Sequence, residues 1–134
     1  MSESISDLNV LLRSLDPHLH EGVYVYSCVL FETDLSSIAV VGTFRESEGL
    51  TIILPEPDAL KNKFPILFRA AWITLSVDSA FEAVGMTAAF ATALGNAGIS
   101  CNVVAGARHD HVFVPIERAV DAMVVLHELG KTAK

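Results

Sequence analysis

A chain of 134 residues is long enough to form a domain of ordinary size with a substantial core. Its net charge of −7 and the lack of a lysine and arginine cluster argue against nucleic acid as a partner, because the fold would repel phosphate. The acidic N-terminus lacks a signal pattern, polar residues interrupt the longest apolar stretch, and two cysteines are too few for a disulfide framework. We therefore expect a soluble cytoplasmic protein with no membrane segment.

In the first half, apolar positions with a helical period predict a helix over residues 8–15, which Asp16 and Pro17 end. His18 and His20 follow in what we expect to be an N-terminal loop unrelated to the rest. GVYVYSCVLF, residues 22–31, is rich in β-branched and aromatic residues and predicts a strand. Two apolar runs around Glu46–Gly49 then predict a hairpin with a polar turn, and residues 57–64 allow a short helix.

In the second half, the pattern predicts a strand over residues 72–77 and a helix over residues 84–97 that Gly98 caps. Strands over residues 101–105 and 111–114 follow, joined by a glycine-containing turn. A last helix begins near Pro115 and ends at Gly130. Its expected buried stripe has the helical period and consists of Ile116, Ala119, Val120, Met123, Val124 and His127.

A weak internal repeat relates the two halves. Residues 40–60 and 103–120 both contain two valines, an arginine, a turn, an apolar strand, a proline and an acidic helix start. This indicates two strand–turn–strand–helix units, each led by another strand. If both are βαββα units, each buries one sheet face under two helices. We place the boundary between a first half with the N-terminal helix, residues 1–66, and a second half, residues 67–134.

The order of the second half, β, α, β, β, α, is ferredoxin-like but short of the last strand. It contains a strand ending at Asp78, a helix opened by Gly85, the AGIS turn at residues 97–100 and a following strand pair. In these features the second half resembles the ACT domain family of small ligand-binding modules. The stretch 72–115 looks like uncharacterised bacterial proteins with two tandem ACT-like halves, a group similar to the tandem ACT domains of aspartate kinases and of the animal cytosolic arginine sensor. The family usually has an Asp a few residues before a Pro-Gly pair, whereas here Val84 precedes Gly85 and the loop is longer.

The resemblance implies an α+β fold class, with two tandem ferredoxin-like (ACT) units whose antiparallel sheets are covered by helices. It also implies binding of an amino acid or a similar metabolite at an interface between ACT units. It implies no chemistry, so we expect no enzyme activity, no catalytic residue, no metal and no cofactor. We expect a regulatory or sensor protein that passes its signal to a separate protein partner.

A strand-to-helix turn supplies the physical basis for such a site. Free amides at a helix start favour a carboxylate, and Asp78 or Glu82 could take an amino or guanidinium group. From the residues alone, an ordinary loop with a capped helix is the alternative. Asn102 interrupts an apolar run, and we expect it to be buried and to need partners. The expected ligand contacts lie in this turn and the nearby hairpin: Asp78, Ser79, Val84, Gly85, Met86, Thr87, Asn102, Val103, Val104 and His109.

The segment His109-Asp110-His111 has three readings. Two histidines on one face of an extended strand can chelate a metal, but no third ligand has matching spacing. We therefore prefer a polar hairpin or a ligand contact, in which a histidine could make binding pH-sensitive. A metal-binding protein or metal-assisted enzyme remains the alternative.

The composition also bears on assembly. About half of the residues are hydrophobic, and excess apolar surface commonly goes into a subunit interface. We therefore expect a homodimer. A ligand-free dimerisation module is a further alternative to a sensor.

Overall fold

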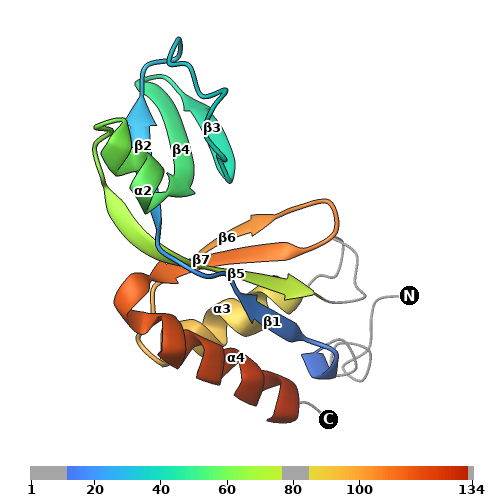
Figure 1. The fold of residues 1–134 in the computed structure, drawn as a ribbon. Coiled ribbons are helices and arrows are strands. Elements are labelled where there is room, and N and C mark those ends of the chain that lie inside the picture. Colours follow the sequence, from blue (N-terminus) through green and yellow to red (C-terminus); the bar gives the residue numbers. More distant parts are fainter. Residues whose placement is uncertain (1–11, 77–84, 133–134) are drawn as a thin grey trace. The chain divides into compact units, whose positions relative to one another are not determined.

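The structure, a computed structural model, describes residues 12–76 and 85–132. It divides into two compact units (Figure 1). The middle unit comprises residues 21–71, and the split unit joins residues 1–20 with residues 72–134. Strand β5 (Phe68–Ser76) begins in the middle unit and ends in the split unit. No helix in the part of the chain that the structure describes is long and apolar enough to cross a membrane.

The middle unit is an antiparallel sheet with one helix. Its elements are β2 (Tyr24–Val29), β3 (Gly42–Glu46), β4 (Gly49–Pro55), α2 (Glu56–Lys61) and the start of β5. The strand order is β3-β4-β2-β5, so the predicted hairpin around residues 46–49 and the predicted short helix are confirmed. Val25, Ile52 and Leu54 are fully buried and pack with Ala59 of α2.

An ion pair connects α2 to the sheet of the middle unit. Arg69 of β5 donates from Nε to Glu56 at 2.6 Å and from a terminal nitrogen at 3.1 Å. These hydrogen bonds lower the pKa of the Glu56 carboxyl. Such forked pairs have well-defined geometry, which suits the first turn of a helix too short to be stable alone.

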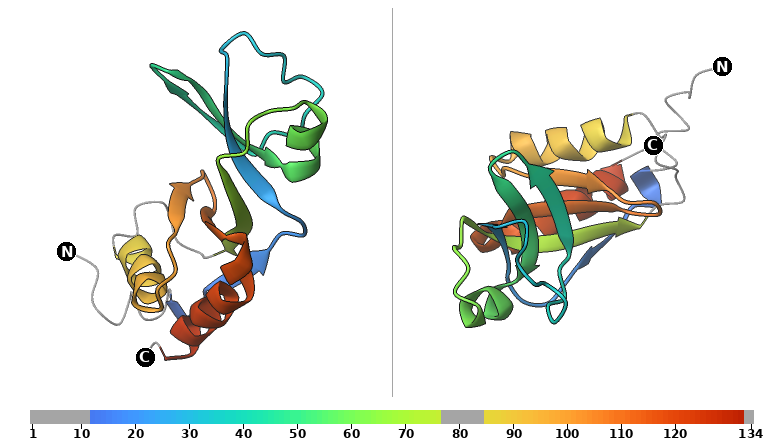
Figure 2. Two further views of the ribbon diagram at one scale, coloured as in Figure 1. Left: turned by 90° about the vertical axis from the view of Figure 1, so that its left-hand side faces the viewer. Right: turned by 90° about the horizontal axis from the view of Figure 1, so that it is seen from above.

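The split unit has helices over one face of its sheet (Figure 1). Its strands are β1 (Asp16–Leu19), the end of β5, β6 (Asn102–Ala105) and β7 (Asp110–Pro115). Its helices are α3 (Met86–Asn96) and α4 (Ala119–Thr132), and α4 follows a 3₁₀ turn, η1 (Ile116–Arg118). Figure 2 shows α3 and α4 from two further directions.

The core of the split unit follows the alternation of its strands. Ile73 and Leu75 of β5 are fully buried, as are Val112 and Val114 of β7. Phe90, Leu94 and Leu126 contribute fully buried side chains from the two helices. Since successive strand residues point to opposite faces, Trp72, Thr74 and His111 lie on the face without helices.

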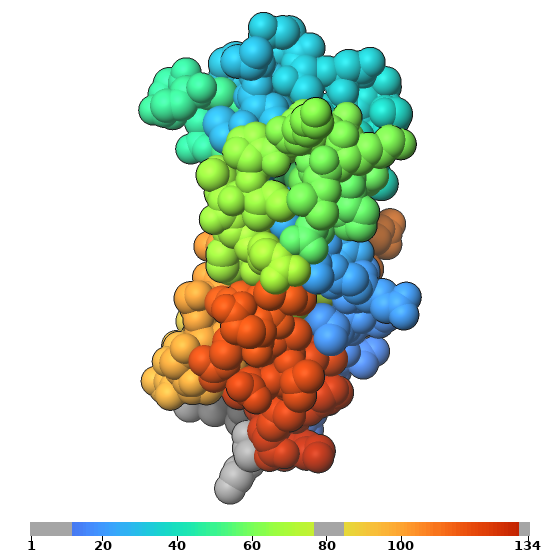
Figure 3. Space-filling model, turned by 60° about the vertical axis from the view of Figure 1, so that its left-hand side comes forward, coloured from blue at the N-terminus to red at the C-terminus, as the bar shows by residue number. Residues whose placement is uncertain are grey.

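The N-terminal segment completes the split unit. Strand β1 pairs antiparallel with β5, with Asp16 opposite Ser76 and Leu19 opposite Ile73. It supplies the strand that the β, α, β, β, α order of this unit lacks. Figure 3 shows this blue segment beside α4 at the surface of the unit. The expectation that His18 lies in an unrelated loop is therefore wrong, because the pairing joins segments far apart in the sequence.

The first half departs from the expected βαββα order. Residues 30–41, all of them described, form turns and bends with no helix between β2 and β3. The sheet of the middle unit is therefore not covered by two helices. Part of its core is filled by loop residues instead, since Leu35, Ile38 and Val40 pack against the buried cluster. At the N-terminus, Leu12 and Arg13 are helical, while the rest of the predicted first helix up to residue 11 lies outside the described residues.

The last helix buries a different stripe from the predicted one. Val120 and Val124 are 72% and 55% exposed, whereas Ala122 and Leu126 are fully buried. Apolar residues occupy most of the circumference of α4, so periodicity alone does not select the buried face. The preceding η1 turn has three residues per turn rather than 3.6 and shifts the register at the helix start.

The predicted end of α4 at Gly130 is also wrong, because the helix continues to Thr132. The glycine instead allows a close approach of the chain. A Cβ at Gly130 would lie 3.2 Å from the carbonyl oxygen of Leu12. Gly130 therefore lets α4 pack closely on the backbone that leads into β1.

Arg118 holds the C-terminal end of α3, where helix carbonyls lack intrahelical partners. Its two terminal nitrogens donate to the carbonyl oxygens of Gly98 and Ala97 at 3.2 and 3.3 Å, and its Nε contacts Asp121 at 3.1 Å. We expect Arg118→Ala to lower the free energy of unfolding by about 1 kcal/mol, because the side chain is partly exposed. Urea unfolding checks this, with Arg108→Ala in the exposed hairpin turn as control; equal effects would contradict it.

Candidate functional site

The start of α3 is the part of the sequence-predicted site that the structure describes. Gly85 has φ +101°, a left-handed conformation that favours glycine, and its carbonyl oxygen accepts a hydrogen bond from the Ala89 amide at 2.8 Å. Met86 is buried and Thr87 is exposed. No side chain among the described residues caps the helix. Asp78, Ser79 and Val84 lie outside the described residues.

The predicted contacts on the β6–β7 hairpin are mostly exposed. Asn102 is exposed rather than buried, because β6 is the last strand in the sheet order and, among the described strands, pairs with β7 alone. Val103 is half-buried and Val104 is 48% exposed. His109 lies in the exposed turn, where its carbonyl oxygen accepts from the Gly106 amide at 2.8 Å.

The two histidines of the HDH segment have different surroundings. His109 precedes β7, whereas His111 lies within β7 on the helix-free face and is half-buried. In residues 12–76 and 85–132, no three His, Cys, Asp or Glu side chains converge to hold a metal ion.

Sequence reasoning missed a cluster on the helix-free face of the split unit. The indole of Trp72 stacks on His20, with 3.6 Å between ring centroids and 10° between planes. Phe113 lies 6.3 Å from the indole centroid at an angle of 16°. His18 meets His20 edge-on at 4.8 Å. Strands β1, β5 and β7 thus bring their aromatic rings into one row.

Hydrogen bonds connect the same rings. The Trp72 indole N–H donates to Nδ1 of His111 at 3.1 Å. The Thr74 hydroxyl oxygen lies 2.7 Å from Nε2 of His20 and 3.1 Å from Nδ1 of His111. We call His18, His20, Trp72, Thr74 and His111 the histidine–tryptophan cluster.

The cluster disfavours positive charge. Desolvation lowers the pKa of His20, and His18 and His111 lower it further by repulsion. Desolvation also lowers the pKa of His111, aided by His109 and opposed by Asp110. Burial raises the pKa of the Asp110 carboxyl, although the neighbouring His111 opposes this. The imidazoles of His20 and His111 are therefore mainly neutral at neutral pH and gain protons as the pH falls.

A sequence signal for this cluster existed. Trp72 and Thr74 in β5, and His111 and Phe113 in β7, stand two residues apart within a strand, so each pair shares a face. His18 of β1 and His20, which directly follows β1, have the same spacing. What the sequence did not reveal is that β1 lies next to β5.

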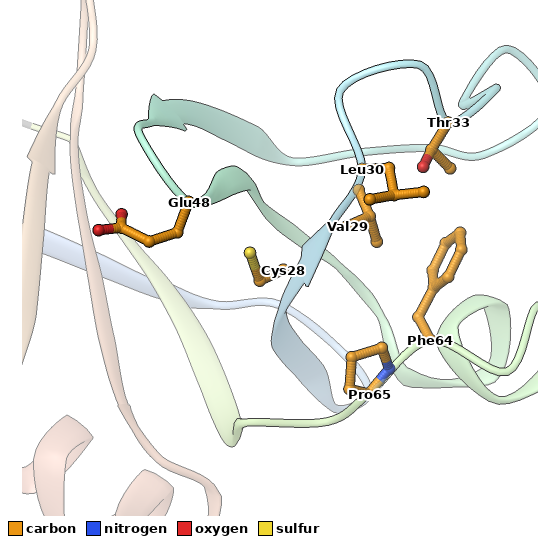
Figure 4. Close-up of a pocket in the computed structure, with 7 residues that line it drawn as sticks. All are labelled: Cys28, Val29, Leu30, Thr33, Glu48, Phe64 and Pro65. Atoms are coloured by element: carbon orange, nitrogen blue, oxygen red, sulfur yellow. The ribbon is translucent and has the colours of Figure 1, made fainter.

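The middle unit contains a shallow pocket of about 320 Å³ (Figure 4). Its lining is mainly apolar and comes from the end of β2, the following loop, the β3–β4 turn and the segment before β5: Cys28, Val29, Leu30, Thr33, Glu48, Phe64 and Pro65. In Figure 4 the Glu48 carboxylate points away from the other lining side chains. The pocket can accept a small apolar group but offers little to orient a charged one.

In comparisons with known proteins, both parts of the chain match the same family. Profiles described as ACT domain match residues 3–71 and residues 68–128. A crystal structure of a Vibrio cholerae protein of unknown function, named a possible transport protein, is 44% identical, covers 94% of this chain and 98% of its own, and has a TM-score of 0.86. No curated protein matches the sequence.

More distant structures share the fold. The ligand-free regulatory subunit of aspartate kinase from Thermus thermophilus is 13% identical, with 84% of this chain and 95% of that chain covered and a TM-score of 0.64. An Agrobacterium tumefaciens protein is 18% identical, with 87% and 89% covered and a TM-score of 0.65.

Proposed function

Since the chain belongs to the ACT domain family and contains two such domains in tandem, we propose that it is a regulatory protein that binds an amino acid beside the start of α3. The fold is that of ACT-type regulatory domains. Because one chain contains two of these domains, they can pair with each other within the same molecule. Binding would shift an equilibrium between two arrangements of the protein.

The observation that carries this proposal is the start of α3. The helix begins at Met86, directly after the left-handed Gly85, without a side-chain cap from the described residues. First-turn amides at such an end, together with the helix dipole, favour an anionic group such as an α-carboxylate. The exposed Thr87 adds a hydroxyl in that turn.

We assign the remaining contacts to the residues that the sequence singled out. Asp78 takes the amino group of the ligand, with Ser79 and Val84 in the same loop. The exposed face of the hairpin, with Asn102, Val104 and His109, contributes on the other side. Catalysis has no part in this proposal.

The proposal extends to assembly and location. We propose a homodimer that signals to a separate protein partner in the cytoplasm. Exposed apolar side chains such as Val120, Val124 and Phe44 would be covered in such assemblies. Both cysteines are free, which suits a reducing compartment.

Thermal melting against the twenty amino acids tests the binding function. A ligand at about 100 times its dissociation constant should stabilise the protein by roughly 2.7 kcal/mol, which raises the Tm by several degrees. Asp78→Ala should abolish the shift, because it removes the partner of the amino group. Glu117→Ala, at an exposed position outside the proposed contacts, should leave the shift unchanged.

The outcomes separate the alternatives. A panel without any shift would overturn amino-acid binding. A constant dimer indifferent to metabolites would then favour a pure dimerisation module. Stoichiometric metal that is lost on His109→Ala or His111→Ala would favour the metal-binding alternative.

A further inference from the structure

We propose that the histidine–tryptophan cluster is a pH switch in which neutral His111 fastens the β6–β7 hairpin to β5 and protonated His111 releases it. The switch lies within the split unit and does not depend on the ligand proposed above. Three observations support the switch: the direction of the Trp72–His111 hydrogen bond, the contacts of the His111 ring, and the further imidazoles beside the same sheet face.

The Trp72 bond requires His111 to be neutral. An indole nitrogen can only donate, so Nδ1 of His111 must accept and carry no hydrogen. The proton of the neutral ring therefore lies on Nε2. An imidazolium carries hydrogens on both nitrogens, and two donors would then face each other across 3.1 Å. Protonation of His111 consequently breaks this bond and requires the ring to move.

His20 responds differently from His111, although both rings contact Thr74. If His20 gains a proton, its Nε2–H can donate to the Thr74 oxygen, whose own hydrogen can turn towards His111. The charged ring would also lie over the face of Trp72, a favourable cation–π position. His20 therefore tolerates protonation within the cluster, and His111 does not.

The groups around His111 agree with this assignment. The neighbouring groups on its own strand and turn are Asp110 and His109. Asp110 favours protonation of His111, and His109 disfavours it. On β5 it meets Trp72 and Thr74, which carry no charge. His18 of β1 and His20, which follows it, place two further imidazoles beside the same face, and repulsion from His18 and His111 lowers the pKa of His20.

Movement of the His111 ring would reach the hairpin directly. His111 is the cross-strand partner of Val104. Its ring also lies close to the turn, since a Cβ at Gly106 would be 3.2 Å from His111 Nε2. The Gly106 amide donates across the turn to the His109 oxygen. A ring that leaves this position removes packing from the turn and from edge strand β6.

The titration of His111 makes the free energy of unfolding depend on pH. The pKa of His111 lies below the ordinary value of 6.5, so the unfolded chain binds a proton where the folded chain does not. Stability is therefore fully present above the ordinary value and decreases as the pH falls through the window below it.

Nuclear magnetic resonance of the ¹⁵N-labelled full chain tests the switch. Trp72 is the single tryptophan, so the indole N–H gives one resonance. Between about pH 7.5 and about pH 5 we expect this resonance to shift with a midpoint below that of free histidine. The protection factor of the Gly106 amide, which compares its exchange with the intrinsic rate at each pH, should fall about tenfold over the same range.

Three variants identify the titrating group. His20 also titrates beside Trp72, so the test is made with His20→Gln as background. The double variant His20→Gln/His111→Asn keeps an acceptor for Trp72 but has no titrating imidazole against the indole, so the indole transition should disappear. His20→Gln alone and the exposed control His127→Asn should retain it. Persistence of the transition in the double variant would overturn the proposal. If that variant does not fold, the imidazole spectrum of the unmodified protein decides, because a hydrogen on Nδ1 of His111 at neutral pH is incompatible with the switch.

Discussion

Phe90→Ala is expected to lower the free energy of unfolding by about 3–5 kcal/mol, which is among the largest effects of a single core truncation. Phe90 lies on α3 and is fully buried in the core of the split unit. Removal of the ring loses apolar contacts and leaves a cavity that the surrounding strands cannot fill. For a domain with an ordinary stability of about 5–15 kcal/mol, this is a large fraction of the total.

Urea unfolding followed by circular dichroism measures this change. Thr92→Ala on the exposed side of the same helix is the matched control and should alter stability by about 0.5 kcal/mol or less. Phe90→Leu should fall between the two, because it retains most of the apolar volume. A loss below about 1 kcal/mol for Phe90→Ala would mean that α3 is not anchored through this ring.

Gly49→Ala is expected to destabilise the middle unit by about 1–3 kcal/mol or more through overpacking. A Cβ at Gly49 would lie 2.9 Å from the Cys28 sulfur and 2.9 Å from the Val29 carbonyl oxygen. The sulfur can turn away, but the carbonyl belongs to strand β2, which is paired with β4 through Val29 and Leu50. The two strands would have to separate locally.

A second glycine provides the control for Gly49→Ala. A Cβ at Gly95 in α3 would meet nothing within 4 Å, so Gly95→Ala should stabilise the protein by about 0.5–1 kcal/mol. The double variant Cys28→Ala/Gly49→Ala removes the sulfur contact and leaves the carbonyl contact. If it regains full stability, the Val29 carbonyl does not restrict this position.

Local chemistry made much of the fold predictable. The hairpin of β3 and β4, the short α2 and the strand pair β6 and β7 all follow from alternating apolar runs and turn residues near one another in the sequence. The repeat of strand, turn, strand, proline and helix is likewise present in both halves, at Pro55 and Pro115. These features depend on neighbouring residues, which is why periodicity finds them.

The remaining features depend on long-range packing. The buried face of α4 was not predictable because apolar residues surround most of the helix, and only contact with the sheet selects Ala122 and Leu126. The histidine–tryptophan cluster was missed for a related reason. The spacing of two residues is visible locally in the sequence, but the row of rings forms only after β1 has joined β5.

The split arrangement of the chain has a consequence for the order of folding. Residues 21–71 of the middle unit are contiguous, so all of their partners within the unit are available once that segment has been synthesised. Strand β1 is synthesised before the middle unit, yet the residues of β5 that pair with it, 73–76, follow the middle unit. Contacts between residues far apart in the sequence form slowly, because closing the large loop between them costs conformational entropy before the contacts can stabilise the fold. We therefore expect the middle unit to fold early and β1 to pair with β5 only after the C-terminal half of the chain has begun to emerge.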